Sequence, residues 1–291
     1  MQPNMPQTFK PKNPLANYMR QPKIYIKLPS NGAFWPDSSI DMPENGQLPV
    51  FSMTARDELM FKTPDALLNG QAMVDVIQSC MPNIKNAWDC PTLDLDTILI
   101  AIRLATYGET MSIKHKIPVI NEEVEYDLDL RVLLDQQTMS VWMEQIAISE
   151  DLIVFVKPLT YRHMTQTSLK SFETSKIMGI VNDDSISDEK KMELFNISFS
   201  NLTKVTVDLM AESIVKIVTS EAQVTDKKMI LEFVNNIDKE MFDAINSHLT
   251  NMKKQNDLKP LQFSTTPEQQ ADGAPEVYTV PISFNESDFF A

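Results

Sequence analysis

Several short stretches of the chain alternate between apolar and polar residues, which is the pattern of a β-strand with one buried face. Residues 23–28 predict a first strand, and residues 50–53 are a second candidate. Three further pairs of stretches are each separated by a polar turn or loop, so each pair predicts a β-hairpin. These pairs are residues 111–118 with 124–130, 143–148 with 152–156, and 261–264 with 277–284.

Apolar residues at spacings of three and four predict helices, which dominate the second half of the chain. One of these helices has the apolar face Phe195, Phe199, Leu202, Val205 and Leu209. Its stripe continues to Ile217 with a small phase shift, and a break near Ser200 would account for the shift. The predicted helices cover residues 160–180, the stretch from Ser187 to Ile217, and the stretch from Asp226 to Met252. Residues 267–275 are expected to form a polar loop.

Local signals mark the helix ends in the first half of the chain. Thr54 is a candidate cap for a short helical turn, because its hydroxyl can accept a free backbone N–H. Thr63 at the cap and Pro64 at the first helical position predict the start of a short helix. Gly70 is expected to close it.

Two further helices are predicted between Gly70 and the first long hairpin. Residues 72–80 form one of them, and Pro82 ends it. Thr92 is expected to cap the other, which ends at Gly108. The apolar positions of this second helix are expected to share one face and are Leu95, Ile98, Leu99, Ile102 and Ala105.

These elements predict the α+β class, with several β-hairpins, a helical second half and a closing C-terminal hairpin. We expect a flexible N-terminal arm over residues 1–22, an α+β region over residues 23–157, and a helical region with the closing hairpin over residues 158–291. The first and last hairpins are expected to contact each other, because an isolated two-stranded hairpin is marginally stable at best.

Charge and composition narrow the range of partners. The 291 residues include 26 Lys and Arg against 40 Asp and Glu, which gives a net charge of −14. Nucleic-acid binding depends on Lys and Arg that neutralise phosphates, and anionic membranes attract basic segments, so neither partner is expected. No apolar run reaches the length of a membrane span, and the N-terminus lacks the pattern of a signal peptide.

No group of residues has the pattern of an active site. The three histidines, His115, His163 and His248, are scattered and none has a second ligand at metal spacing. Cys80 and Cys90 are expected to be reduced, buried thiols. The chain has no phosphate-binding loop, dinucleotide fingerprint or nucleophile elbow. We therefore expect no enzyme activity, no cofactor and no metal.

Two acidic pairs leave an alternative open. Asp94 with Asp96, and Asp127 with Asp129, would suit acid–base or divalent-metal chemistry in a metal-dependent hydrolase. The simpler interpretation places the first pair at a helix N-terminus, where it complements the dipole. The second pair shares one strand face that is expected to meet water.

Four aromatic residues are candidates for partner binding. Phe34 and Trp35 lie in a loop rich in proline and glycine, where they are expected to act as an anchor. Phe289 and Phe290 end the chain together, and adjacent terminal phenylalanines are expected to dock on the body or on a partner. The N-terminal arm has the alternative role of a strap that becomes ordered on a neighbouring subunit.

The run from Thr54 to Gly108 resembles baseplate hub proteins of T4-like contractile-tailed bacteriophages. The resemblance rests on the ordered text TARDE, KTPDALLNG, CMP and DLD, followed by IRLATYG. The hairpin after this run, KPLTY, the long helices and the closing hairpin follow in a similar order, so the resemblance covers roughly residues 50–291. Relatives are expected to carry Cys-x-x-Cys in the hairpin turns, whereas residues 117–122 and 265–270 contain no Cys, so a thiolate zinc site is unsupported.

The resemblance implies a non-enzymatic role in assembly of the viral baseplate hub, as a hub component or as an assembly chaperone. The implied partners are other hub or tail-assembly proteins and the chain itself. The implied location is the cytoplasm of the infected host cell or the virion tail baseplate. A host-interaction or adaptor protein unrelated to the tail is the alternative.

Overall fold

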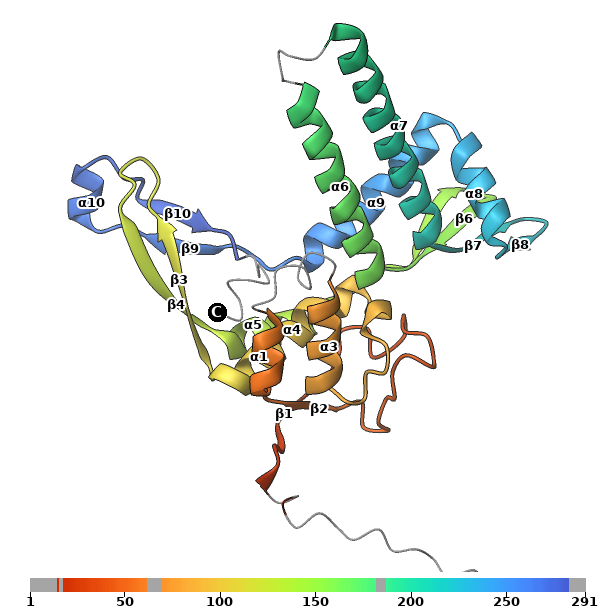
Figure 1. The fold of residues 1–291 in the computed structure, drawn as a ribbon. Helices are drawn as coiled ribbons and strands as arrows, with labels where there is room; N and C mark the ends of the chain where they lie inside the picture. Colours follow the sequence, from red (N-terminus) through yellow and green to blue (C-terminus); the bar gives the residue numbers. More distant parts are fainter. Residues whose placement is uncertain (1–14, 16–17, 62–69, 182–186, 283–291) are drawn as a thin grey trace, which may run out of the picture.

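The computed structural model describes residues 15, 18–61, 70–181 and 187–282. It confirms the α+β class, with helices around several small antiparallel sheets (Figure 1). The described part of the chain consists of a body, an arm made of two β-hairpins, a pair of long helices that projects from the body, and a four-stranded sheet with its own helices.

The body forms around one central helix, α4 (Thr92–Tyr107). Twelve of the 16 residues of α4 are buried, so the helix is covered on all sides and not only on the predicted face. Such a helix belongs in the middle of a core. The elements of the body that contact α4 are β1 (Pro22–Ile26), β2 (Leu48–Phe51), α3 (Gln71–Cys80) and α5 (Leu130–Thr138). The helix α1 (Ala55–Phe61) and the 3₁₀ helix η2 (Ala87–Asp89) pack in turn against α3.

The predicted helix ends of the body are confirmed in part. The Asp57 N–H donates to Thr54 Oγ1 at 3.2 Å and the Thr54 N–H donates to Asp57 Oδ2 at 2.7 Å, so Thr54 caps α1 as predicted. Gly108 follows α4 with a φ of 97°. Thr92, by contrast, is the first helical residue and not the cap, because the extended Pro91 takes the cap position. The predicted helix start at residues 63–64 lies outside the described residues.

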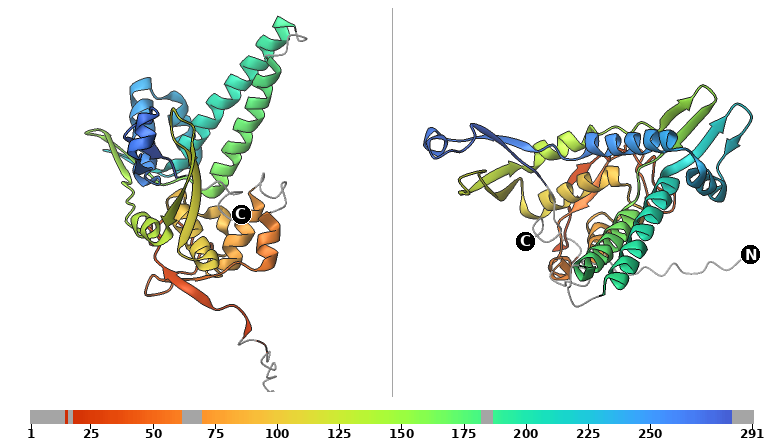
Figure 2. Two further views of the ribbon diagram at one scale, coloured as in Figure 1. Left: turned by 90° about the vertical axis from the view of Figure 1, so that its left-hand side faces the viewer. Right: turned by 90° about the horizontal axis from the view of Figure 1, so that it is seen from above.

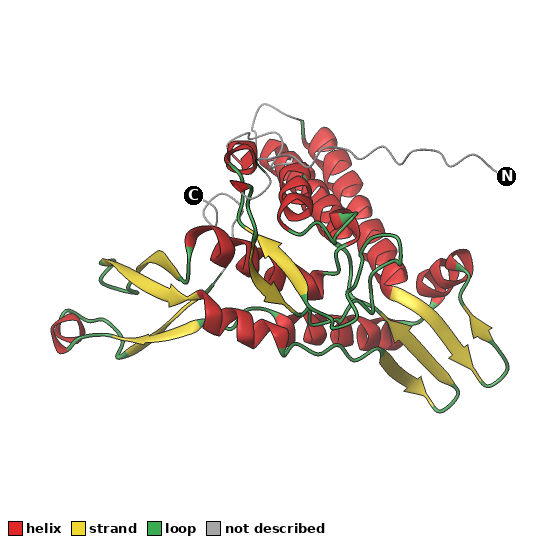
Figure 3. Ribbon diagram, turned by 90° about the horizontal axis from the view of Figure 1, so that it is seen from below, coloured by secondary structure: helices red, strands yellow, loops and turns green. Residues whose placement is uncertain are grey.

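Two β-hairpins form an arm beside the body (Figure 1 and Figure 3). The strands β3 (Thr110–Lys116) and β4 (Glu123–Asp129) pair antiparallel, and so do β9 (Leu261–Ser264) and β10 (Val277–Val280). Ile117, Tyr278 and Val280 are buried between the hairpins, and the hydroxyl groups of Tyr126 and Tyr278 form a hydrogen bond. The expected contact between the first and last hairpins is therefore confirmed.

The helices α6 (Tyr161–Val181) and α7 (Asp188–Ser213) form an antiparallel pair that projects from the body (Figure 2). The predicted break near Ser200 is wrong, because α7 is continuous across this residue. The prediction that the helix continues to Ile217 is also wrong. It ends at Ser213, and residues Ile214–Thr219 form strand β7. The phase shift in the apolar stripe thus marks a change from helix to strand.

Strand β7 belongs to a four-stranded antiparallel sheet with the order β5-β6-β7-β8. The predicted hairpin of β5 (Gln145–Ser149) and β6 (Leu152–Val156) is confirmed, and β8 (Gln223–Val224) completes the sheet. The single long helix predicted after Asp226 is two helices, α8 (Lys227–Asn236) and α9 (Lys239–Asn256). The second begins because Asp238 accepts the Met241 N–H, which caps a new helix.

The loop predicted over residues 267–275 contains a short helix, α10 (Pro267–Ala271). Thr266 and Gln269 form a reciprocal capping box at its start, and Pro267 occupies the first helical position. This helix lies at the end of the arm (Figure 1).

Apolar residues gather in three clusters. The largest fills the body around α4, the second lies between the four-stranded sheet and the helices α7, α8 and α9, and the third joins the two hairpins of the arm. Helix α9 runs between the arm and the four-stranded sheet (Figure 3). The division of the chain near residue 158 stays a prediction.

Candidate interaction surfaces

The root of the helix pair is fixed firmly to the body. The Tyr161 N–H donates to Cys90 O at 2.8 Å, and the Thr92 N–H donates to Leu159 O at 2.8 Å. The segment that leads into α4 and the segment that leads into α6 are therefore hydrogen-bonded to each other. The buried Tyr161 ring stacks on Trp88, with the ring centroids 5.6 Å apart. Arg162 covers the same indole at 5.4 Å, and its guanidinium lies 3.6 Å from the Asp89 carboxylate. The direction in which the helix pair projects is therefore set by packing at its root.

Helix α7 carries a stripe of large apolar side chains that are exposed to solvent. We call Met192, Phe195, Phe199 and Leu202 the α7 stripe; their exposed fractions are 63%, 45%, 64% and 40%. The Phe195 and Phe199 rings stack nearly parallel, with centroids 6.5 Å apart and 13° between their planes. Large apolar side chains that gather on one exposed surface mark sites of protein contact more often than single ones do.

The stripe lies beside the face of α7 that packs against α6. Ser198 and Val205 are buried at 2% and 9% exposure and lie on that inner face. The predicted apolar face therefore divides: Val205 is buried, whereas Phe195, Phe199 and Leu202 face solvent. Met192 was not part of the predicted face. Its signal in the sequence is the spacing of three and four residues that it shares with Phe195 and Phe199.

Three of the four stripe residues, Phe195, Phe199 and Leu202, also lie in an uncharged part of the chain. Residues 194–203 include no Asp, Glu, Lys or Arg, although 23% of the whole sequence is charged. A helix face that stays in water normally carries charged side chains. The missing charge and the exposed phenylalanines together indicate a surface that is covered by another protein.

Of the four predicted partner-binding residues, the structure describes two. Trp35 is only 6% exposed, and its indole N–H donates to Asp94 at 2.7 Å, so it anchors its loop internally and offers no surface to a partner. Phe34 is partly exposed and packs edge-on against Trp142, which precedes β5. It keeps its candidate role. Phe289 and Phe290 lie outside the described residues.

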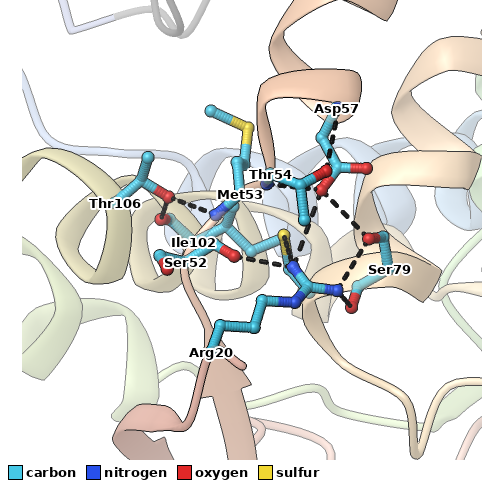
Figure 4. Close-up of polar contacts among 9 residues, drawn as sticks. Arg20, Ser52, Met53, Thr54, Asp57, Ser79, Ile102 and Thr106 are labelled. Carbon is cyan, nitrogen blue, oxygen red and sulfur yellow. Dashed lines mark hydrogen bonds and ion pairs between the residues drawn. The ribbon is translucent and has the colours of Figure 1, made fainter. Parts of the chain in front are cut away.

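The predicted N-terminal arm leaves the body at Arg20, which is held by a network of polar contacts (Figure 4). Its guanidinium donates to Ser52 O and to Ser79 O, each at 2.6 Å, and lies 3.6 Å from the buried Asp57 carboxylate. Ser79 Oγ donates to the same carboxylate at 3.0 Å. Apart from residues 15 and 18–22, the arm lies outside the described residues.

A hollow of about 570 Å³ adjoins this network. It is open and largely apolar, and the charged group in its lining is the guanidinium that Asp57, Ser52 and Ser79 already hold. This arrangement fixes the exit point of the N-terminal segment.

The acidic residues at the start of α4 do not form a joint site. Asp94 is fully buried, and it accepts hydrogen bonds from the Ser30 N–H at 2.9 Å, the Ser30 hydroxyl and the Trp35 indole. Burial raises the pKa of Asp94, and these hydrogen bonds oppose the shift. Asp94 is thus more than a charge at a helix start, because it ties the Ser30–Trp35 loop to the body.

Asp96 lies near the end of α9. Burial, and then the negative charge of Asp257, raise the pKa of Asp96 to about 6, whereas the Lys253 ammonium acts in the opposite direction. In the other acidic pair, Asp127 accepts the Ser112 hydroxyl at 2.6 Å and Asp129 caps α5. The two pairs lie on different elements and have structural partners, which gives the alternative of a hydrolase no support.

The thiols and histidines also have structural surroundings. Both cysteines are buried; burial raises the pKa of Cys80 to about 12 and that of Cys90 well above its usual value. Burial lowers the pKa of His163, which shares a hydrogen bond with Thr160 at the start of α6. Within the described residues, no three His, Cys, Asp or Glu side chains are grouped so that they could hold a metal ion.

A membrane-spanning segment needs length and hydropathy together, and none of the helices in the described part of the chain combines them.

Comparison with known proteins assigns the family. The sequence profile of the family described as T4 bacteriophage base plate protein matches residues 49–265. Searches among curated proteins and among solved structures gave no match. The matched range covers more than half of the chain and extends from β2 through β9, so it includes most of the body, without β1, as well as the projecting helix pair and most of the arm. The chain therefore belongs to the T4 bacteriophage base plate protein family.

Proposed function

We propose that this protein acts without catalysis in assembly of the central hub of the phage tail baseplate, through contacts with other proteins. Its role is that of a hub component or of a chaperone for hub assembly. Its partners are other hub or tail-assembly proteins, and its place of action is the cytoplasm of the infected cell and the growing baseplate. The family assignment supports the baseplate role.

The observation that carries this proposal is the exposed α7 stripe on a helix pair whose root is fixed. A projecting pair of helices presents side chains at a distance from the body, and packing at Tyr161 keeps its direction constant. Exposed Phe195 and Phe199 have the character of interface anchors, because aromatic side chains bury a large area with few rotatable bonds.

Mass spectrometry of finished particles and of assembly intermediates tests the role. A hub component is found in both samples, whereas a chaperone is found only in the intermediates. Finding the chain in neither sample, together with normal baseplates after deletion of its gene, would show that the proposed function is wrong.

Capture of baseplate proteins from infected cells tests the surface. Phe195→Ser with Phe199→Ser is expected to reduce the recovered tail-assembly proteins at least about tenfold, since interface anchors each contribute about 2 kcal/mol or more. Ile197→Ser is the matched control, because Ile197 is 45% exposed on the opposite flank of the same helix. Equal loss in the control and in the double variant would contradict a role for the stripe.

A further inference from the structure

The α7 stripe has the spacing of a seam between two helices. Its residues follow each other at intervals of three, four and three: Met192, Phe195, Phe199 and Leu202. This is the repeat at which one helix keeps the same face toward another helix, whereas a flat or irregular surface does not require it. The spacing of the stripe therefore suits an occupant that is itself a helix with a matching apolar repeat.

We propose that this occupant is the α7 stripe of a second copy of the chain, packed antiparallel about a two-fold axis. The axis crosses the seam midway between Phe195 and Phe199, at the height of residue 197 along the helix, and the Ile197 side chain lies on the opposite flank. This inference rests on the proposed function, because the second copy covers the same surface reversibly and gives way when a baseplate protein binds it. The register follows from the spacing, which brings Phe195 opposite the second copy's Phe199 and Met192 opposite the second copy's Leu202. Both contacts occur twice, as a two-fold interface requires.

Charge along the seam agrees with this pairing. Residues 194–203 carry no charge, so the centre of the interface buries no unpaired ion. In the antiparallel register, the positions that flank the seam bring Asn196 next to the second copy's Asn196 and Glu189 next to the second copy's Thr203. On this flank of the seam no two like charges meet, so the stripe is compatible with pairing to its own copy.

The antiparallel direction also separates the two acidic bodies. Helix α7 rises about 1.5 Å per residue, so Ser213 at its root lies about 24 Å from the axis near Ile197. The two roots are then about 48 Å apart along the seam. Salt screens charges beyond about 8 Å at physiological ionic strength. The net charge of −14 on each copy does not prevent association in this arrangement.

The surface area that the α7 stripe can bury between two copies predicts a weak, reversible dimer. Half-exposed aromatic or large aliphatic side chains can each bury on the order of 100 Å². Four such residues with their polar flanks bring the interface of two copies to about 1,000 Å², which is the size of transient complexes. A dissociation constant in the micromolar range is expected.

Analytical ultracentrifugation of the full-length protein over a range of concentrations tests the pairing. The protein is expected to sediment as a monomer–dimer equilibrium, and Phe199→Glu is expected to weaken association at least tenfold. Ile197→Glu introduces the same charge on the opposite flank of α7 and is expected to leave association unchanged. A protein that stays monomeric at all concentrations, or a dimer that Phe199→Glu does not weaken, overturns the proposal.

Oxidative cross-linking tests the direction and register. Asn196→Cys is expected to form a covalent dimer readily, because the two copies of this position lie across the axis from each other. Thr203→Cys is expected not to do so, because its opposite position is Glu189. Both native cysteines are buried and do not compete. Equal cross-linking of the two variants would indicate parallel helices and overturn the register.

The outcome separates this inference from the proposed function. If the protein is monomeric but its stripe still captures baseplate proteins, the self-pairing is wrong and the function stands. If the protein dimerises through the stripe but captures no baseplate protein and leaves baseplates unaffected, the pairing stands and the function is wrong.

Discussion

At the residue scale, several carboxylates that would suit acid–base chemistry have structural roles instead. Asp94 is a buried carboxylate that holds the Ser30–Trp35 loop, and Asp57 performs a similar task for Arg20. A buried carboxylate that accepts several hydrogen bonds is costly to disturb, because every lost donor leaves a charged acceptor unsatisfied.

Replacement of Trp35 by phenylalanine tests this role of Asp94. The indole N–H that donates to Asp94 at 2.7 Å is lost while most of the aromatic volume remains. The free energy of unfolding is expected to fall by about 1–3 kcal/mol in urea titrations. In an Asp94→Asn background the same replacement is expected to cost less, because the acceptor no longer carries a charge. Equal losses in both backgrounds would show that packing, and not the hydrogen bond, explains the effect.

Asp96 predicts a dependence of stability on pH. Its pKa in the folded protein is about 6, above the ordinary value of 3.8, so the folded state keeps a proton that the unfolded state has released between about pH 4 and pH 6. Stability contributed by the protonated form is therefore present at low pH and is lost as the pH rises through this window.

Asp96→Asn removes this loss. The variant is expected to be more stable than the native protein by about 1–2 kcal/mol at pH 7.5 and nearly equal to it at pH 4, measured by urea unfolding at both values. Asp37→Asn deletes the same charge in an exposed loop and is expected to show no such difference between the two pH values. A variant that is less stable than the native protein at pH 7.5 would contradict the assigned direction.

At the element scale, close packing at the root of α6 depends on Gly70. This residue has a φ of +75°, and a Cβ added to it would lie 3.0 Å from the Tyr161 hydroxyl and 3.1 Å from Thr165. Two separate costs are expected from any side chain here, one from the left-handed backbone and one from the clash.

Comparison of Gly70→Ala with Gly46→Ala separates the two costs. Gly46 also has a positive φ, +68°, but nothing lies within 4 Å of its added Cβ. Gly46→Ala is expected to lower the unfolding free energy by about 1 kcal/mol, and Gly70→Ala by about 2–4 kcal/mol, in parallel chemical denaturation. Similar losses for the two variants would mean that Gly70 contributes through its backbone conformation alone.

The element scale also shows how far the sequence predicts this fold. The hairpins were predictable from their alternation, and α4 from its apolar spacing and its glycine stop, although its predicted Thr92 cap is wrong. The change from α7 to β7 was missed, although Ile214, Val215, Ile217 and Val218 form a β-branched run that favours a strand. The helical spacing of apolar residues continues across this change by chance. It also continues across Asp238, the cap at which α9 begins, so the spacing predicts one helix where the structure has two.

The candidate site was predictable in its residues but not in its exposure. Periodicity identifies Phe195, Phe199 and Leu202 as one face of a helix. It does not say whether that face meets the core or solvent, because this depends on which other elements reach the helix. The neighbouring Val205 has the same apolar character and is buried. The uncharged stretch 194–203 is the signal in the sequence that favours a contact surface.

At the scale of the whole molecule, two parts of the chain extend away from the body. The helix pair and the two-hairpin arm extend from it in different directions (Figure 1 and Figure 2). Local stability is expected to differ between these parts, because the arm has its own small apolar cluster.

This difference predicts that the arm opens without unfolding of the body. Tyr278 is 5% exposed and contacts both hairpins, with its ring stacked on His115 and its hydroxyl bonded to Tyr126. Neither hairpin is expected to persist alone. Tyr278→Ala should therefore accelerate amide hydrogen exchange in β3 and β4, as well as in β9 and β10, at least about tenfold, since loss of a buried aromatic side chain costs about 3 kcal/mol or more. Amides of α4 should exchange as before.

Val277→Ala, at a neighbouring position that is 51% exposed, is the control and should leave the amides of the arm protected from exchange. Faster exchange confined to β9 and β10 would show that the first hairpin is stable without the last, whereas faster exchange in α4 as well would show that the arm and the body unfold together.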